Sequence, residues 1–568
     1  MAKQRQSSPP PIASPQHRSL AHGQTSGKVY LVGAGPGDAG LISWRGVQCL
    51  CQADAVLYDY LVNPVILRHA PKAAQMICLG RHRKAEGRTQ TAESSDARES
   101  GTERIWPQSE INLQLVKLAQ AGKRVVRLKG GDPAVFGRLL EEVTALEAAG
   151  VEYEIVPGIT AAMAAGSYAG IWITQRDAAS AVALITGHEG DSDHAPPLNY
   201  AALAAFPGTL VFYMGVTTAR EWTAALIGAG KSPETPAAIV RRCSWPDQTT
   251  IRCTLGKVVE QLEAARMRPP MVIIVGSVAS PNLSSLAVEG PAAGPEQQAN
   301  SWFTRRPLFG QRILLTRPID RTEALWQPLT ELGADCLVQP AIEISPPDDW
   351  QHVDSALDRL CDFDWLVFSS VNGVQFLFER LLATGRDLRH LAGIKLAAIG
   401  PGTAEELAQY HLRVDGQPAD VYRAEALAEL LAKDARGKKY LLARASRGRE
   451  VLAETLQAAG AQVEQIVVYR STDVAPPDPD IAAALKAGRI DWVTVTSSAI
   501  ARSLAKMFGE DLRNTKLVSI SPVTSAALSE LGFRPAAEAQ QYTMEGVVAA
   551  ILRPALLTDL QVCHVRTV

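Results

Sequence analysis

The feature that most constrains the fold is an alternation that recurs along nearly the whole chain. Short apolar runs rich in β-branched residues end in glycine- or aspartate-containing turns, and a helical pattern follows each turn. This alternation predicts an α/β architecture. The predicted strands are KVYLVGAG, DAVLYD, RVVRLKGGD, TLVFYMG and MVIIVGSV in the first half, and RILLTRP, DWLVFSS, LAAIGPGT, YLLARA, DWVTVTSS and LVSISPVT in the second.

Length and composition exclude several classes of protein. The chain has 568 residues, enough for about three to five domains. It is 46% hydrophobic and 20% charged with a net charge of −2, which is ordinary for a globular protein and less basic than a generic nucleic-acid binder. Cys49 and Cys51 form a lone C-x-C, so we predict no metal site and reduced cysteines. No apolar run is long enough to predict a membrane span.

Polar and low-complexity stretches set the predicted domain limits. They are rich in Pro, Ser, Gln, Gly or mixed charges and lack large apolar residues. The predicted organisation is a disordered arm at 1–27, a first domain at 28–284 with a flexible insertion at 84–103, a linker at 285–305, a second domain at 306–556 and a tail at 557–568.

The second half contains a weak internal repeat. DWLVFSSVNGV at 364 resembles DWVTVTSSAIA at 491, and LAAIGPGTAEEL at 396 resembles LVSISPVTSAAL at 517. The two separations are similar, which predicts two similar α/β lobes with a ligand site between them.

The first predicted strand ends in a glycine-rich turn, GAGPGD at 33–38, and Asp59 closes the next strand. A Rossmann site for NAD is therefore a competing interpretation. Two residues weaken it. Asp38 stands where the third glycine of that fingerprint is needed, and Pro36 has no N–H to offer a phosphate.

Three further glycine turns follow strands in the first half, KGGDP at 129–133, VPGITAA at 156–162 and FYMG at 212–215. Each alone is an ordinary α/β turn, with glycine for a positive φ and threonine to cap a helix. Four such turns in this order are more specific, and they argue against NAD.

On these motifs, residues 28–283 resemble the uroporphyrinogen-III C-methyltransferases of the tetrapyrrole methylase family. The matching stretches are VYLVGAGPGD, ADAVLYDYLV, EINLQLVKLAQAGKRVVRLKGGDPAVFGR, VPGITAA, SYAGI, TLVFYMG and MVIIVGSV. The resemblance implies two α/β lobes with S-adenosyl-L-methionine bound between them. It also implies two methylations of uroporphyrinogen III to precorrin-2, and a homodimer formed through this half.

The resemblance implies site residues as well. Asp59 corresponds to the proposed general base, with a strand-terminal turn residue as the alternative. The implied cofactor contacts are Pro36, Gly130, Gly131, Asp132, Val135, Thr160, Ala161, Met214 and Cys243. A cofactor without phosphate needs close backbone approach, hence glycines, and an acid such as Asp132 for its hydroxyl or ammonium groups. Cys243 stands where the family often has Gly or Ala, so its side chain must find room.

Two departures from the family pattern bear on catalysis and substrate. Arg81 stands where the family often has a lysine proposed as proton donor, and arginine suits a carboxylate clamp better than an acid. Trp172 and Gln175 replace the favoured Pro and His. Because the substrate is a polycarboxylate, arginines beside the motifs are predicted to bind it, chiefly Arg138 and Arg176.

Residues 306–556 show no Ser-His-Asp order, metal cluster or phosphate loop. Their motifs resemble uroporphyrinogen-III synthase: RILLTRP, DWLVFSSVNGV, LAAIGPGTAEEL, VYRAEALAELL, REVLAETLQAAGAQVEQIVVYRST, DWVTVTSS, ISPVTSAALSELGF and AEAQQYTMEGVVAAI. The resemblance implies closure of hydroxymethylbilane with inversion of ring D, in which the protein mainly orients the substrate. It also implies a discontinuous lobe, 307–343 with 476–553, and a second lobe at 344–475.

Tyr469 corresponds to a family tyrosine proposed to assist departure of the substrate hydroxyl, and a half-buried strand tyrosine is the alternative. Three hydroxyl residues on strand-end turns are predicted to hold acetate and propionate arms or to cap helices: Thr403, Ser497 and Thr524. Ser521 stands where the repeat has Gly400, so we expect one turn to differ.

The product of the implied second-half reaction is the substrate of the first half. We therefore interpret the chain as α/β, a two-lobed tetrapyrrole methylase fold followed by a two-lobed α/β uroporphyrinogen-III synthase fold. The predicted protein is a cytoplasmic bifunctional enzyme that converts hydroxymethylbilane to precorrin-2 for siroheme or cobalamin, without nucleic-acid or membrane partners. The alternative is a methyltransferase for a later corrin precursor, joined to a non-catalytic tetrapyrrole-binding sensor.

Overall fold

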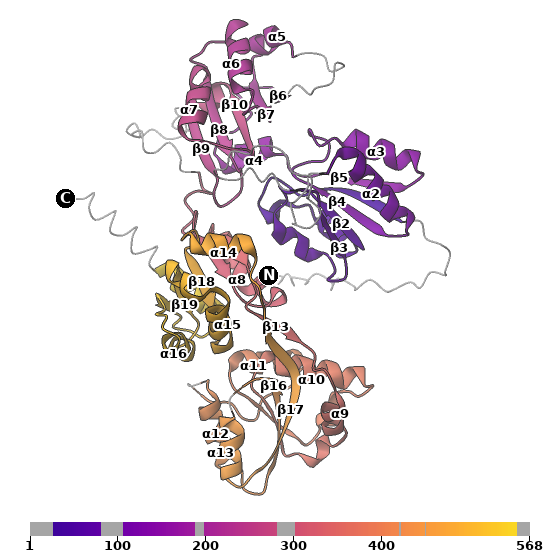
Figure 1. The fold of residues 1–568 in the computed structure, drawn as a ribbon, viewed down its shortest axis with the longest axis vertical. Helices are drawn as coiled ribbons and strands as arrows, with labels where there is room; N and C mark the ends of the chain where they lie inside the picture. The colour runs from indigo at the N-terminus through magenta and orange to yellow at the C-terminus, as the bar shows by residue number, and fades with distance from the viewer. Residues whose placement is uncertain are drawn as a thin grey trace, which may run out of the picture. The chain divides into compact units, whose positions relative to one another are not determined.

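The computed structural model describes residues 27–80, 106–187, 198–280 and 301–553, apart from residues 420, 421 and 449 and the side chain of residue 320. It divides into two compact units, Met1–Thr304 and Arg305–Val568. Each unit contains two five-stranded sheets flanked by helices (Figure 1). The predicted insertion and tail, and nearly all of the predicted arm, lie outside the described residues.

The first sheet of unit 1 is fully parallel, in the order β3-β2-β4-β1-β5. Its strands are β1 (Lys28–Gly33), β2 (Ala55–Tyr58), β3 (Gln75–Cys78), β4 (Arg124–Lys129) and β5 (Glu152–Val156). The helices of this region are α1 (Trp44–Cys51), α2 (Gln108–Gln120) and α3 (Leu139–Ala148). Because the strands are parallel, all five end at the same edge of the sheet, and three of the glycine turns lie there.

The second sheet of unit 1 is mixed, in the order β6-β7-β10-β8-β9, with β10 antiparallel to both neighbours. Its strands are β6 (Val182–Thr186), β7 (Thr209–Tyr213), β8 (Pro236–Arg241), β9 (Thr249–Thr254) and β10 (Met271–Val275). Its helices are α5 (Tyr200–Ala205), α6 (Ala219–Gly228) and α7 (Val258–Ala264), and α4 (Ala161–Tyr168) follows β5. Every residue of the central strand β10 is buried, as its unbroken apolar run predicts.

The end of the predicted linker packs on unit 1. Phe303 is 2% exposed, and its ring centroid lies 4.7 Å from that of Tyr168. The Trp302 ring lies 5.2 Å from Tyr168, and its Nε1 donates to the carbonyl oxygen of Ser167 at 2.9 Å. The Tyr168 hydroxyl in turn donates to Asp38 Oδ2 in the first glycine turn at 2.9 Å. An aromatic pair next to the boundary between the units therefore contacts the residue that supports that turn.

In unit 2, one sheet is built from two separated stretches of chain, in the parallel order β12-β11-β18-β19-β20. Its strands are β11 (Arg312–Leu315), β12 (Asp335–Val338), β18 (Trp492–Val495), β19 (Lys516–Ser519) and β20 (Ala537–Glu538). Its helices are α8 (Glu323–Glu331), α14 (Pro479–Lys486), α15 (Ser498–Phe508) and α16 (Pro522–Glu530). This is the discontinuous lobe that the resemblance implies.

The other sheet of unit 2 has the order β13-β17-β16-β14-β15, with only β13 antiparallel to its neighbour. Its strands are β13 (Ile342–Ser345), β14 (Trp365–Phe368), β15 (Lys395–Ala398), β16 (Lys439–Ala445) and β17 (Gln462–Asp473). Its helices are α9 (Gln351–Asp358), α10 (Val371–Ala383), α11 (Pro401–Gln409), α12 (Ala424–Ala432) and α13 (Val451–Ala458). The chain passes between the lobes next to a hydrogen bond from Val474 N to Ala341 O, a few residues before the predicted boundary at 343/344.

The internal repeat is confirmed by equivalent strand pairs. β14 pairs with β15 so that Trp365 lies opposite Lys395, and β18 pairs with β19 so that Trp492 lies opposite Lys516. Each lysine ammonium lies over its tryptophan ring, 5.3 and 5.4 Å from the centroid. The same cross-strand contact thus marks the same place in both lobes.

The expectation that Ser521 alters its turn is wrong. Gly400 and Ser521 have nearly the same extended backbone, with φ of −164° and −163°. The serine instead adds a cap, since its Oγ accepts from the Thr524 amide at 3.4 Å, while Gly400 has no side chain to do so.

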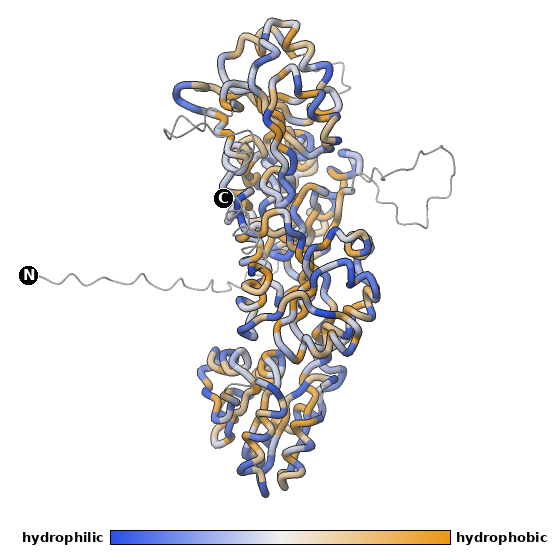
Figure 2. Tube along the Cα trace, turned by 90° about the vertical axis from the view of Figure 1, so that its left-hand side faces the viewer, coloured by the Kyte–Doolittle hydropathy of each residue, from blue (hydrophilic) through white to orange (hydrophobic). Residues whose placement is uncertain are grey.

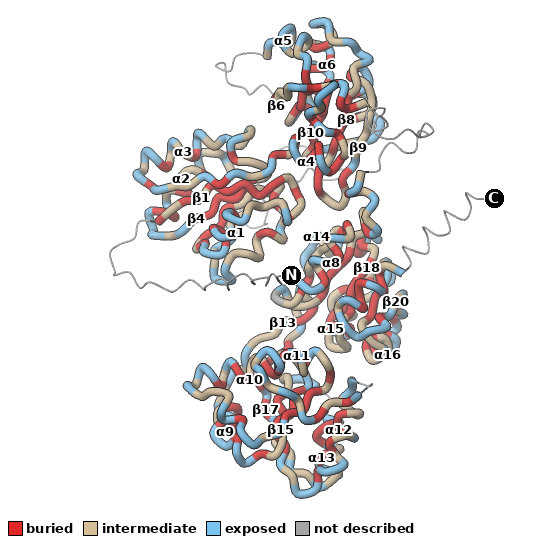
Figure 3. Tube along the Cα trace, turned by 180° about the vertical axis from the view of Figure 1, so that it is seen from behind, coloured by how far each residue is buried: buried red, intermediate tan, exposed pale blue. Residues whose placement is uncertain are grey.

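In Figure 2, hydrophobic stretches gather in the interior of each unit and hydrophilic stretches along its periphery. Buried positions follow the central strands, among them β1, β4 and β18 (Figure 3). Every predicted strand run contains a strand of the structure, which confirms those predictions. The strands that the runs miss include the edge strands β3, β12 and β20, whose partial exposure leaves no continuous apolar signal.

Candidate active sites

Three of the glycine turns meet at the carboxyl edge of the parallel sheet in unit 1. A Cβ added at Gly33 would lie 2.5 Å from the Cα of Gly158 and 2.8 Å from the carbonyl oxygen of Gly131. Gly35 and Gly131 exchange two backbone hydrogen bonds of 3.2 and 2.8 Å. The ends of β1, β4 and β5 are therefore packed backbone to backbone, which only glycine permits at these positions.

Asp132 joins two of these turns. Its Oδ2 accepts from the Gly158 amide at 2.9 Å, and its Oδ1 accepts from the Ala134 amide at 2.8 Å. Gly130 precedes it, and the half-buried Val135 donates its amide to the Asp132 carbonyl. The Asp132 carboxylate therefore stabilises the predicted cofactor turn through these hydrogen bonds. It is also a polar group at the surface of that turn.

The first glycine turn contacts the second sheet through residues that the motifs did not predict. Trp245 Nε1 donates to the carbonyl oxygen of Pro36 at 3.2 Å, and a Cβ on Gly37 would lie 2.2 Å from the Trp245 ring. The Asp38 amide donates to Ser244 Oγ at 3.0 Å. The adjoining Cys243 is 5% exposed, so its side chain has found room inside the fold, and burial raises the pKa of its thiol to about 12.

Tyr213, at the end of β7, links three other predicted positions. Its hydroxyl lies 2.7 Å from Thr160 Oγ1 and accepts from the Ala162 amide at 2.8 Å, which fixes the start of α4 at Ala161. Met214 follows it with φ of +53° and a side chain that is 52% exposed. The structure therefore brings Thr160, Ala161 and Met214 to one place.

The predicted base Asp59 is the partly exposed member of a charge network whose other three members are buried. Arg127 Nη2 lies 2.7 Å from Asp59 Oδ1, and Arg127 Nε lies 3.0 Å from Glu142 Oε1. Lys129 Nζ lies 2.7 Å from Glu142 Oε2, and the Glu142 side chain has no exposed surface. Burial, followed by the nearby Arg127 cation, lowers the pKa of Lys129. Hereafter Asp59, Arg127, Lys129 and Glu142 are called the charge network.

The arginines that were predicted to bind substrate are not part of the charge network. Arg138 is exposed and forms an ion pair with Glu141 at 2.7 Å. Arg176 is exposed and has no hydrogen-bond or ion-pair partner among the residues described. Arg81 and the polar insertion lie outside the described residues.

In unit 2, Tyr469 lies on β17 directly after an irregularity in its pairing with β16. Such an irregularity changes the direction in which the following side chains point. The side chain of Tyr469 is 7% exposed, and its hydroxyl lies 3.1 Å from Ser370 Oγ at the N-terminus of α10. The Phe376 ring stacks on Tyr469 with centroids 5.8 Å apart, and burial raises the pKa of the Tyr469 phenol. The phenol is more deeply buried than the half-buried strand tyrosine of the alternative interpretation.

The three predicted hydroxyl residues all lie at helix starts that follow parallel strands. Ser497 precedes α15 and accepts from the Ile500 amide at 3.2 Å, as Ser370 does for α10. Thr403 in α11 and Thr524 in α16 are only 5% and 2% exposed. Their side chains are therefore enclosed within the first helical turns, and their contact with acetate or propionate arms stays a prediction.

Comparison with known proteins covers both units. Residues 28–259 match the family model of Tetrapyrrole (Corrin/Porphyrin) Methylases, and residues 323–549 match that of Uroporphyrinogen-III synthase HemD. A "Porphyrin biosynthesis protein HemD" of Ruminiclostridium josui is 32% identical over 526 residues, 92% of this chain and 95% of its own. The chain belongs to the family of fused tetrapyrrole methylases and uroporphyrinogen-III synthases.

Other relatives match over less of the chain. A "Uroporphyrinogen-III C-methyltransferase" of Bacillus subtilis is 35% identical over 67% of this chain and 71% of its own length. A "Siroheme synthase" of Sodalis glossinidius is 44% identical over 47% of this chain and 50% of its own. The chain is thus a bifunctional tetrapyrrole-biosynthesis protein with a methyltransferase part and a synthase part. None of the helices described is long and apolar enough to cross a membrane.

The methyltransferase part has a surface that fits the methyl donor of its family. Met214 and Phe136 are exposed apolar side chains, both with φ of +53°, and Phe136 lies 5.1 Å from the Tyr213 ring. Holding large side chains on this backbone is unfavourable and is typical of binding sites. A Cβ on Gly131 would meet only Thr160 Cα, at 3.9 Å. Apolar side chains beside open backbone turns suit a ligand with an aromatic base and polar amino-acid groups.

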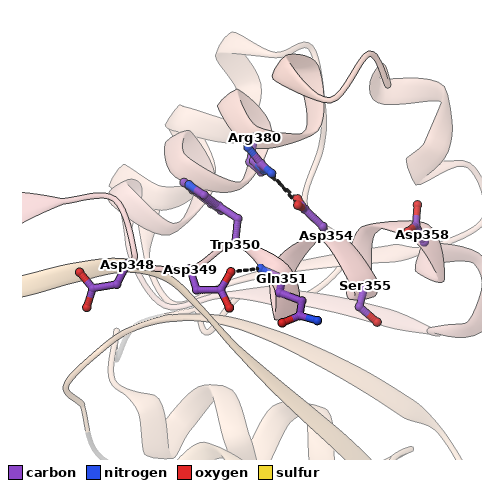
Figure 4. A pocket seen from close by; sticks show the side chains of 8 residues that line it. All are labelled: Asp348, Asp349, Trp350, Gln351, Asp354, Ser355, Asp358 and Arg380. Carbon is purple, nitrogen blue, oxygen red and sulfur yellow. Dashed lines mark hydrogen bonds and ion pairs between the residues drawn. The ribbon is translucent and has the colours of Figure 1, made fainter.

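One cavity at the surface of the synthase part is lined mainly by acidic residues. It measures about 610 Å³ and is lined by Asp348, Asp349, Trp350, Gln351, Asp354, Ser355, Asp358 and Arg380. Figure 4 shows Arg380 paired with Asp354, and Asp349 accepting a hydrogen bond from the Gln351 amide. None of the predicted residues lines this cavity. Its charge is unfavourable for a polycarboxylate substrate, so we do not assign it to the synthase reaction.

Proposed function

We propose that this chain converts hydroxymethylbilane to precorrin-2 in two steps, in support of siroheme or cobalamin synthesis. The synthase part closes the bilane to uroporphyrinogen III, and the methyltransferase part methylates that product twice. The observation that carries the proposal is the 32% identity to one relative across 92% of the chain, which links both parts in one protein. The two parts then act on consecutive compounds.

S-adenosyl-L-methionine, the methyl donor, supplies an electrophilic methyl group when it is bound. The turns at Pro36, Gly130 and Asp132, with Met214 and Cys243, hold and orient this donor. Asp59 accepts the proton that the methylated pyrrole carbon loses, and Arg127 orients the Asp59 carboxylate through its 2.7 Å ion pair. The contribution of the protein is mainly proximity and orientation.

In the synthase part, Tyr469 donates a hydrogen bond to the departing hydroxyl of the bilane. A tyrosine phenol is protonated at neutral pH, and burial raises the pKa of Tyr469 further, so the donor is available. Backbone amides at the starts of α10 and α15 bind substrate carboxylates, since helix N-termini favour anions. Closure with inversion of ring D then follows from how the bound chain of the substrate is folded.

The proposal also includes a homodimer formed through the methyltransferase part, and a cytoplasmic location. Sedimentation of the full chain measures the mass of the particle. A monomer at micromolar concentration would contradict the dimer without affecting the proposed reactions.

The decisive test is an anaerobic assay of the full chain with hydroxymethylbilane, with and without S-adenosyl-L-methionine. Product mass and isomer are analysed after oxidation. We expect type III isomer without the methyl donor and a dimethylated product with it. Type I isomer alone would overturn the synthase role and favour a binding sensor. Type III isomer without methyl transfer would overturn the substrate assigned to the methyltransferase part.

A further inference from the structure

Arg321 of the synthase part reaches from one lobe to the other. It ends a short helix (Ile319–Arg321) that follows β11, in the discontinuous lobe. Its Nη2 donates to Oε1 of Gln375, which lies on α10 of the other lobe. This hydrogen bond therefore joins the two lobes at the helix that carries Ser370.

The partner of Arg321 is neutral but held in one orientation. Gln375 Nε2 donates to Oε1 of Glu406 at 2.8 Å, and Glu406 is 8% exposed on α11. The Gln375 side-chain amide thus contacts the Arg321 cation through its oxygen and the Glu406 carboxylate through its nitrogen. Within the described residues no carboxylate pairs with Arg321, and Gln375 is its only hydrogen-bond partner. A guanidinium has five donors, so most of them remain open to a ligand.

Arg321 lies beside the Tyr469 site. Gln375 precedes Phe376, whose ring stacks on Tyr469, and Ser370 at the start of the same helix contacts the Tyr469 hydroxyl. Burial raises the pKa of Tyr469, and the Arg321 cation is among the groups that oppose this rise. The cation is therefore close enough to act on the phenol electrostatically.

We propose that Arg321 binds a carboxylate of the tetrapyrrole substrate at the Tyr469 site and so helps to hold the two lobes around it. The inference rests on the proposed synthase function and names a substrate-binding residue that the motifs did not predict. An arginine and a carboxylate form two parallel charge-assisted hydrogen bonds, which are about twice as strong as neutral ones. A substrate arm therefore displaces the neutral amide of Gln375 favourably.

The test compares Arg321→Gln and Arg321→Lys with the wild-type chain in the bilane assay. We expect Arg321→Gln to raise KM for hydroxymethylbilane about tenfold or more, with kcat within about twofold. Arg321→Lys should recover part of the lost substrate affinity, because lysine keeps the positive charge but lacks the paired donors of the guanidinium. The wild-type KM should rise with salt more steeply than that of Arg321→Gln, since one ionic contact is missing from the variant.

Arg513→Gln is the control, because Arg513 is exposed and pairs with Glu510 on its own turn. Its KM should equal that of the wild type. Methyl transfer to added uroporphyrinogen III and the melting temperature verify that each variant is folded. An unchanged KM in Arg321→Gln, or a lysine variant no better than glutamine, would overturn the inference. Turnover by the wild-type chain decides the proposed function separately, and if the chain only binds the bilane, Kd replaces KM in the same comparison.

Discussion

The two proposed catalytic side chains, Asp59 and Tyr469, are held by opposite means. Asp59 is ion-paired to a buried arginine, and that arginine shares a fully buried glutamate with Lys129. Tyr469 is held by a serine hydroxyl at 3.1 Å and by a stacked phenylalanine. A buried charge is strongly destabilising once its partner is removed, whereas a lost hydroxyl contact costs much less. Function and stability should therefore be tightly linked in the methyltransferase part and separable in the synthase part.

The largest effect is expected from Glu142→Gln. The change leaves Arg127 and Lys129 buried beside a neutral amide, and we expect it to destabilise the methyltransferase part by about 3–5 kcal/mol. Denaturant unfolding with methyl transfer as the readout measures this loss. Glu141→Gln is the matched control, because its ion pair with Arg138 is exposed and its loss should cost less than about 1 kcal/mol. Equal losses in the two variants would contradict the importance of the charge network.

Gly33→Ala should have the next largest effect. The added methyl would lie 2.5 Å from Gly158 Cα and must push the ends of β1 and β5 apart. We expect a loss of about 1–3 kcal/mol and weaker binding of the methyl donor, measured by calorimetry. Gly228→Ala places its methyl in open space at the end of α6 and serves as the control. Unchanged donor binding in Gly33→Ala would separate this turn from the cofactor site.

Tyr469→Phe should separate function from stability in the synthase part. We expect the rate of type III isomer formation to fall at least about tenfold, while the free energy of unfolding drops by only about 1 kcal/mol. Tyr440→Phe also removes one buried hydroxyl contact in the same sheet, to Leu431 O at 3.3 Å. That control should lose similar stability but no activity. A comparable loss of activity in both variants would make Tyr469 a packing residue.

The smallest effect should come from a carboxylate at the passage between the synthase lobes. Hydrogen bonding from Ser503, with Arg447 and Lys506 nearby, holds the pKa of Asp473 far below its usual range. A lowered carboxyl pKa stabilises the fold above the unfolded value of about 3.9, and the contribution is lost as pH falls. We expect Asp473→Asn to lower the melting temperature by about 2 °C at pH 7. The gap should begin to narrow only below about pH 4 and shrink further as the pH falls toward the lowered pKa of folded Asp473, and a gap independent of pH would exclude this ionic origin.

The sequence predicts the elements better than the contacts between them. Apolar runs located the central strands, and glycine turns located Gly130, Gly131 and Thr160 at one sheet edge. The charge network was not predictable in the same way, because Glu141 and Glu142 look alike in an ordinary helical pattern, yet only Glu142 is buried. Arg127 and Lys129 inside an apolar strand were the available signal of a buried pair.

The sites depend on contacts between residues far apart in the chain, and such contacts leave little trace in sequence. Trp245 and Ser244 support the turn at Pro36 from more than two hundred positions away. In the synthase part, the repeat predicted matching helix starts, but not the enclosure of Thr403 and Thr524 or the position of Arg321. Local patterns fix where a turn forms, while burial is decided by the partner that covers it.

The aromatic pair next to the unit boundary determines where the two enzymes can be cut apart. A methyltransferase fragment ending at the predicted boundary of residue 284 would leave Tyr168 without the rings of Trp302 and Phe303. The complementary fragment would carry those two rings without Tyr168 to pack on, and Phe303, now buried, would be exposed, where apolar surface favours aggregation. A gene split after Thr304 keeps Trp302 and Phe303 in the methyltransferase fragment, where they pack against Tyr168. The boundary between the two parts therefore lies closer to the synthase part than composition alone suggests.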